Sequence, residues 1–258
     1  MKFQTNIDFE IKYLKVFSDL LTFFLVAMFK FLVWMTLTSS LSMGINHDRK
    51  GRIKMGEPNH NCDDAEWPNN YIDIGCNDFI CSGPTVKGAR KHTVKLDLSQ
   101  PDYGAMHMCM NKKIVYNRTI PSSGDHRPLW AKYGEYAYCP PQRWLHNAEH
   151  GGIIFLYNPC LESSQIKLLR KAVKKAKVKK YVMTPYSLPR DMPIAVVAWR
   201  SVLQMNAVDV KQIVKFSKKR YNKGPESTNK EGQYTFGYRK SLDSYIADLN
   251  QIFGIEFC

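Results

Sequence analysis

Residues 140–159 read PPQRWLHNAEHGGIIFLYNP, and this stretch decides the fold. The continuous apolar run at residues 153–157 is typical of a buried strand, and Asn158-Pro159 ends it. About two helical turns fit between the paired prolines and the paired glycines; Pro141 suits a helix start and Gly151 suits the position just after a helix end. The stretch therefore predicts a short capped helix that turns directly into a core strand.

The same short helix carries residue types that bind metals. His146 and His150 are four residues apart and share one helix face, and Glu149 is next to them. A tight turn at residues 122–124 can bring His126 back toward the core. Imidazoles and a carboxylate suit a divalent ion such as zinc. We therefore expect a candidate metal site at His126, His146, Glu149 and His150. In the alternative, these side chains only satisfy backbone groups.

The order H-x-x-E-H is also the inverted zinc-hydrolase signature, in which the histidines bind zinc and Glu149 is the general base. Such an enzyme needs a third protein ligand and an open coordination position. The third ligand could be the imidazole of His126 or the carboxylate of Glu162, Asp191 or Glu226. A zinc-dependent hydrolase is thus the first alternative to a non-catalytic protein.

A copper-handling protein is the second alternative. Residues 106–110 read MHMCM, which at strand period places three methionines on one face and His107 and Cys109 on the other. Soft sulfur ligands suit Cu(I), so Met106, Met108 and Cys109 could bind copper together with the histidines. A methionine stripe that faces the core is the more common arrangement. Zinc and copper are therefore the candidate cofactors.

The remaining elements predict an α+β fold. Periodicity predicts helices over residues 161–178, 208–221 and 242–253 and strands over 181–184 and 194–199. Strand, helix and strand with short links predict a right-handed parallel crossover. Residues 113–118 are expected to extend the strand at 106–110 or to pair with it. We expect a small mixed sheet with a β-α-β crossover, flanking helices and disulfides.

The charge of the chain is strongly positive. Its 258 residues carry a net charge of +14, and 44% of them are hydrophobic, which excludes a disordered composition. Much of the excess lies in residues 167–180, whose apolar positions predict an amphipathic helix with a solvated basic face. The same face would suit phospholipid headgroups or acidic glycans. No nucleic-acid motif accompanies the charge, so we expect no nucleic-acid partner.

The N-terminal segment predicts export. Residues 20–41 are apolar apart from Lys30, and small residues allow cleavage after Ser42, so residues 1–42 are a signal peptide or a signal-anchor. Basic residues just after the segment favour cleavage; if it is uncleaved, it would attach the protein to a membrane. Asn117 begins an N-glycosylation sequon. The expected location is the secretory pathway, either luminal or extracellular.

The cysteines agree with an oxidising compartment. There are seven, none in a C-x-x-C pair, and six could form three disulfides in fifteen ways. We expect the spare to be Cys258, either free or in an inter-chain bond, and the disulfide candidates to be Cys62, Cys76, Cys81, Cys109, Cys139 and Cys160. Residues 43–105 are expected to be loop-rich, residues 106–226 to form the core domain, and residues 227–258 to form a helix and tail.

Several short blocks of the core domain resemble those of a known protein family. They are PSSGDHRPLW at 121–130, GEY at 134–136, PPQRWLHNAEHGG at 140–152, YNPC at 157–160, TPY at 184–186, AW at 198–199 and GPE at 224–226. Together they resemble the domain of unknown function 3105 family over roughly residues 105–226, and its animal members most closely. The resemblance implies a secretory-pathway or membrane protein, with growth restraint suggested for the animal members. It implies no chemistry, and the protein partner is unknown.

Overall fold

The computed structural model describes Met28, residues 47–48, 54–66, 72–96 and 105–254, Glu256 and Cys258. The chain divides into a unit of residues 1–44 and a unit of residues 45–258, and the fold below is that of the second unit. Apart from Met28, the expected signal segment lies outside the described residues. Among the described residues, no helix has the length and apolar character needed to cross a membrane.

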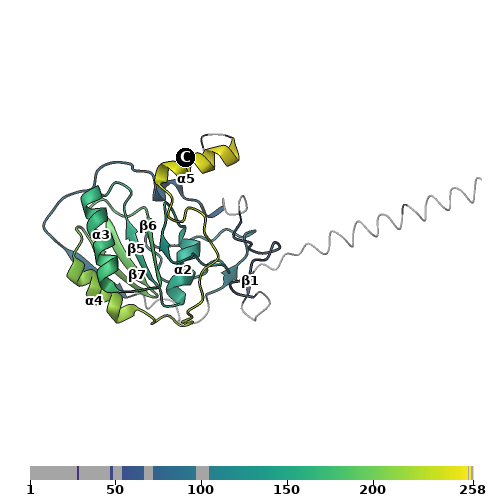
Figure 1. Cartoon of the computed structure of the whole chain (residues 1–258), viewed down its shortest axis with the longest axis horizontal. Coiled ribbons are helices and arrows are strands. Elements are labelled where there is room, and N and C mark those ends of the chain that lie inside the picture. Colours follow the sequence, from purple (N-terminus) through teal and green to yellow (C-terminus); the bar gives the residue numbers. More distant parts are fainter. Residues whose placement is uncertain are drawn as a thin grey trace, which may run out of the picture. The chain divides into compact units, whose positions relative to one another are not determined.

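The second unit is built on a six-stranded mixed sheet (Figure 1). The strands lie in the order β2 (His92–Leu96), β8 (Ser201–Met205), β7 (Ile194–Ala198), β5 (Ile153–Tyr157), β6 (Tyr181–Pro185) and β4 (Gly134–Glu135). The pairs β5–β6 and β6–β4 are parallel, and the other pairs are antiparallel. The α+β class and the mixed sheet predicted from the sequence are therefore confirmed.

The central crossover also agrees with the prediction. Helix α3 (Ser163–Ala176) connects β5 to β6, and these strands pair in parallel, with Ile154 opposite Val182. Strand β8 was not expected. It follows β7 after two residues, and the turn needs a positive φ of 55° at Arg200, where no glycine or asparagine announces it.

The side chains of β5 alternate between two hydrophobic clusters, one on each face of the sheet. Ile154 and Leu156 pack on the side of helix α2 (Pro141–Glu149), whereas Ile153 and Phe155 pack on the side of α3 and helix α4 (Val210–Arg220). Figure 1 shows α2 on one face and α3 and α4 on the other. Both faces of β5 are covered, which is why its sequence is continuously apolar.

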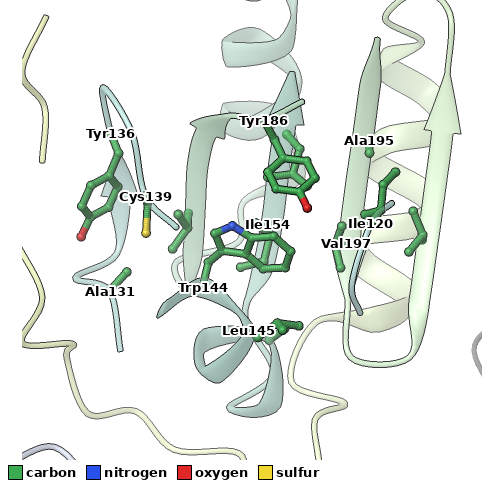
Figure 2. Packing of buried hydrophobic residues seen from close by; sticks show 14 of the residues in the cluster. Ile120, Ala131, Tyr136, Cys139, Trp144, Leu145, Ile154, Tyr186, Ala195 and Val197 are labelled. Carbon is green, nitrogen blue, oxygen red and sulfur yellow. The ribbon is translucent and has the colours of Figure 1, made fainter. Parts of the chain in front are cut away.

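The α2 face of the sheet is filled by large aromatic side chains. Trp144 of α2 is fully buried; Figure 2 shows its ring next to that of Tyr186, in the cluster that also contains Ile154 and Val197 of β7. The rings of Trp144 and Tyr186 meet edge to face, with centroids 6.0 Å apart. This packing fixes the position of α2 against the sheet.

Three disulfides join distant parts of the unit. They are Cys62–Cys109, Cys76–Cys258 and Cys81–Cys160. The spare cysteine is therefore Cys139 and not Cys258, contrary to the expectation. Cys139 lies fully buried in the cluster on the α2 face, and burial raises the pKa of its thiol well above the usual value.

The bond at Cys258 follows from the packing of the last helix. Helix α5 (Leu242–Phe253) buries Tyr245 and Leu249 against Phe79 and Tyr138. Phe79 follows the short 3-10 helix η2 (Cys76–Asp78), so this packing accompanies the disulfide between Cys258 and Cys76.

The Met-rich segment is shorter than expected. Strand β3 (His107–Met108) pairs with β1 (His47–Asp48), and a parallel bridge joins His107 to His126. Residues 113–118 form no strand, so the predicted extension is wrong. A turn at Cys109–Lys112 reverses the chain, and Ile114 is then buried from a loop.

Candidate metal centre

Helix α2 positions the candidate site, and its ends are as the prolines and glycines predict. It begins at Pro141 after an extended Pro140 and ends at Glu149, with His150 as its C-cap. Gly151 follows with a φ of 77°, and a Cβ there would lie 2.7 Å from the Asn222 backbone. Only glycine fits this approach, so the C-terminal end of α2 is held in place.

The backbone orients three of the histidine rings. Carbonyl oxygens lie within hydrogen-bonding distance of Nδ1 in three pairs, which are His126 with Gly124 (2.8 Å), His146 with Arg127 (2.6 Å) and His150 with Glu226 (2.6 Å). A carbonyl oxygen only accepts, so each Nδ1 carries the hydrogen. In a neutral ring, Nε2 then bears a lone pair and is free to bind a cation.

Four buried side chains converge on one point. Ligand atoms of His107, His126, His146 and Glu149 all lie within 4.8 Å of one another. Glu149 Oε2 is 3.0 Å from His126 Nε2 and 3.5 Å from His107 Nε2. Ligands of a tetrahedral ion at zinc distances are about 3.4 Å apart. The cluster is therefore compact enough to hold one metal ion.

The pKa shifts of Glu149 and His146 favour the metal-binding forms of these two side chains. Burial opposes ionisation of Glu149, but His126 and His107 outweigh it and hold the pKa of Glu149 well below its usual range. Burial, followed by the neighbouring histidines, lowers the pKa of His146 well below its usual value. A lone pair on His126 Nε2 would repel the Glu149 carboxylate at 3.0 Å unless a proton or a cation lay between them.

His150 is beside this cluster without being one of its four members. Its ring centroid is 4.5 Å from that of His146, so the two histidines share one side of the helix as predicted. Its Nε2 is buried and has no hydrogen-bond partner among the described residues. Burial lowers the pKa of His150 to about 4, so the ring is neutral at pH 7.

The hydrolase pattern matches this geometry only in part. In that pattern His146 and His150 bind the metal and Glu149 acts as base, whereas here Glu149 lies among the ligand atoms and His150 lies beside them. The carboxylates of Glu162 and Asp191 form ion pairs with Lys87 and Lys91 at the surface. Glu226 contributes its backbone oxygen, to His150.

The structure removes the thiolate ligand that the copper alternative requires. Cys109 is bonded to Cys62, so it offers no thiolate to a metal. The member missing from the predicted His/Glu site is His107, which the sequence pattern placed only beside Cys109. An isolated parallel bridge to His126 brings it into the cluster, and such a single bridge leaves no pattern in the sequence.

Two buried arginines frame the cluster. Arg127 binds Asp73 through Nε and Nη2 at 2.7 and 2.6 Å, and Arg143 binds Asp63 through Nη1 and Nη2 at 2.5 and 2.9 Å. All four side chains are at most 1% exposed. The loop-rich region before residue 105 therefore supplies the counter-charges for the region that holds the histidines.

An aromatic wall closes one side of the cluster. The Trp130 ring lies 4.8 Å from the ring of His146 and 4.7 Å from that of His150. The residue after Trp130 is Ala131, and the Asn147 side chain binds its backbone. Asn147 accepts a hydrogen bond from Ala131 N at 3.0 Å and donates one to Ala131 O at 2.7 Å. The Asn147 side chain of α2 thus fixes the backbone next to Trp130.

Comparison with known proteins adds a family and no chemistry. No curated protein and no solved structure matches the chain. Residues 107–233 match the family model described as protein of unknown function (DUF3105). The matched segment contains the whole cluster, His107, His126, His146 and Glu149, together with both framing arginines. The match supports the assignment of residues 107–233 to the DUF3105 family of proteins of unknown function.

Proposed function

We propose that this protein is an exported, non-catalytic domain that binds one divalent metal ion through His107, His126, His146 and Glu149. The observation that carries the proposal is the convergence of these four ligand atoms within 4.8 Å. The four residues are between 0 and 7% exposed. Four protein ligands in a closed site are typical of a structural metal, whereas a catalytic metal keeps an open position.

The donor set favours zinc as the bound ion. Three imidazole nitrogens and one carboxylate oxygen are common zinc ligands, and Cu(II) competes for the same donors. Cu(I) is less suited, because the nearby sulfur of Cys109 is in a disulfide. We therefore expect zinc in the native protein and Cu(II) as the strongest competitor.

Export is supported by the covalent structure. Three disulfides are typical of proteins from an oxidising compartment, and Asn117 of the sequon is exposed. The resemblance of the core blocks to tumour protein p53-inducible protein 13 points the same way. That type would be a luminal or membrane-associated protein with a link to growth restraint, acting through a protein partner.

Metal content tests the proposal most directly. Protein secreted from a eukaryotic host should contain about one zinc per chain by mass spectrometry of the elements. His107→Ala and His146→Ala should lose the metal and melt at a lower temperature, because binding and folding are linked. His92→Ala, on the exposed strand β2, is the matched control and should keep both.

His150→Gln separates the proposed site from the hydrolase pattern. The variant should keep the metal in our assignment, because His150 is outside the four-residue cluster. Equal metal loss in His150→Gln and His146→Ala would favour the hydrolase ligands instead. If the wild type holds no metal and neither Zn(II) nor Cu(II) raises its melting temperature, the cluster is only a hydrogen-bonded core.

Glycosylation tests export separately. A glycosidase should increase the electrophoretic mobility of the secreted protein, and Asn117→Gln should abolish that shift. Thr119→Ser is the matched control, because it keeps the sequon and should keep the shift. An unshifted wild-type protein recovered with all thiols reactive would remove the assignment to the secretory pathway.

A further inference from the structure

Helices α3 and α4 repeat one lysine spacing on their exposed sides. The pattern i, i+4, i+7, i+8 occurs in each helix, as Lys167, Lys171, Lys174 and Lys175 in α3 and as Lys211, Lys215, Lys218 and Lys219 in α4. All eight are exposed, and neither helix contains an acidic residue. We call these eight residues the lysine face.

The packing of the two helices sets the lysines in two neighbouring rows. Leu169 and Val173 of α3 and Ile213 and Phe216 of α4 are buried in the cluster on one face of the sheet, so the lysines are on the solvent side. The two helices contact each other there (Figure 1). At a rise of 1.5 Å per residue, each row is about 12 Å long.

The charge of this face is not neutralised within the described part of the chain. None of the eight lysines forms an ion pair there, whereas Arg170 of α3 is bound by Glu135 at 2.6 Å. Like charges at this spacing repel and destabilise a helix. Two uncompensated rows are therefore complementary to an extended anion.

The surroundings distinguish between classes of anion. Insertion into a membrane needs exposed apolar side chains beside the basic ones, and no large exposed apolar residue of the described chain lies in α3 or α4. The disulfides are typical of an oxidising compartment, where nucleic acid is not the usual polyanion. Lysine is a flexible point charge, which suits repeated anionic groups better than one fixed bidentate partner.

We propose that the lysine face binds a linear sulfated glycan. The glycan would lie along the two rows, with its sulfate and carboxylate groups between the ammonium groups. The proposal is independent of the metal centre, because the lysine face and the histidine cluster lie on opposite faces of the sheet.

The test is calorimetric titration of the full chain with a heparin oligosaccharide of defined length at 0.15 M salt. We expect saturable binding that weakens about tenfold or more at 0.5 M salt, because exposed charges are screened. Combined Lys171→Glu, Lys174→Glu, Lys215→Glu and Lys218→Glu should weaken binding about tenfold or more. Circular dichroism and melting temperature check that this variant folds.

The matched control is Lys95→Glu, Lys112→Glu, Lys113→Glu and Lys230→Glu, four exposed lysines outside the two helices with the same change of net charge. It should stay within about threefold of the wild type, since those charges are off the proposed contact. If the helix variant unfolds, replacement of the same four helix lysines by glutamine takes its place.

Three outcomes overturn the proposal. Equal weakening in the helix and control variants would mean that net charge alone attracts heparin. An unbound wild type would leave the face a solvated surface. Binding to vesicles that contain phosphatidylserine, without binding to heparin, would identify a membrane surface as the partner.

Discussion

The two faces of the central sheet are covered in opposite ways. On one face, α3 and α4 each bury a single apolar stripe and expose their lysines. On the other face, all nine residues of α2 are buried, including Arg143 and His146. The first face is stabilised mainly by apolar burial, which has no preferred direction, whereas the second depends on directional polar contacts.

This difference indicates which face of the sheet tolerates substitution. An amphipathic helix tolerates changes on its exposed side, since those side chains contact little. A fully buried helix with charged residues needs a partner for every polar group, because an unpaired buried charge is costly. Substitutions on the α2 face should therefore have larger effects than matched substitutions on the α3–α4 face.

The largest expected difference is between two carboxylates that each bind an arginine. Asp63→Ala removes the buried partner of Arg143 and should lower the free energy of unfolding by about 3–5 kcal/mol. Glu135→Ala removes the partner of Arg170, which is 47% exposed, and should cost under about 1 kcal/mol. Urea denaturation measures both. Equal losses of unfolding free energy in the two variants would contradict the proposed difference between the two faces.

The next effect is a pH dependence confined to the α2 face, measured on metal-free protein. His146 and His150 have lowered pKa values in the fold, about 4 for His150. Below about pH 6.5 the unfolded chain therefore binds protons that the folded chain does not. Stability should be full above that pH and fall toward pH 4, by about 1.4 kcal/mol per pH unit for each histidine.

His150→Gln sharpens this measurement. The slope of unfolding free energy against pH should decrease by about 1.4 kcal/mol per pH unit, the contribution of one proton, because one buried neutral ring has been removed. His92→Gln, on an exposed strand of the same sheet, should leave the slope unchanged. The assignment fails if His92→Gln flattens the slope as much as His150→Gln does.

The smallest effect concerns how the helices begin. The carboxylate of Asp209 accepts from the backbone N–H groups of Lys211 and Gln212 at the start of α4. Asp209→Ala should cost about 1 kcal/mol, and Asp209→Asn should retain most of the cap. Helix α2 begins after Pro140 without a side-chain cap, so Pro140→Ala has no cap bond to remove. A larger loss in Asp209→Asn than in Asp209→Ala would exclude capping as the cause.

Sequence reasoning succeeds where a pattern is local and fails where a contact joins residues far apart in the chain. Helix α5 has the predicted bounds, and α3, α4 and β5–β7 agree with prediction within two residues, because their patterns of burial are local. The pairing of Arg127 with Asp73 spans 54 residues, and no local pattern announces such a contact. Helical spacing correctly placed His146 and His150 on one side of α2. Spacing alone does not predict how far each ring lies from the other ligands of the cluster.

The buried arginine pairs set a lower limit on the size of an independent folding unit. The family match begins at residue 107, whereas Asp63 and Asp73 precede it. A fragment cut to residues 107–233 would bury two guanidinium groups without their carboxylates, and it would also lose all three disulfides. We therefore expect such a fragment to be insoluble or molten. Recombinant work on relatives matched over the same segment should include the acidic loops that precede it.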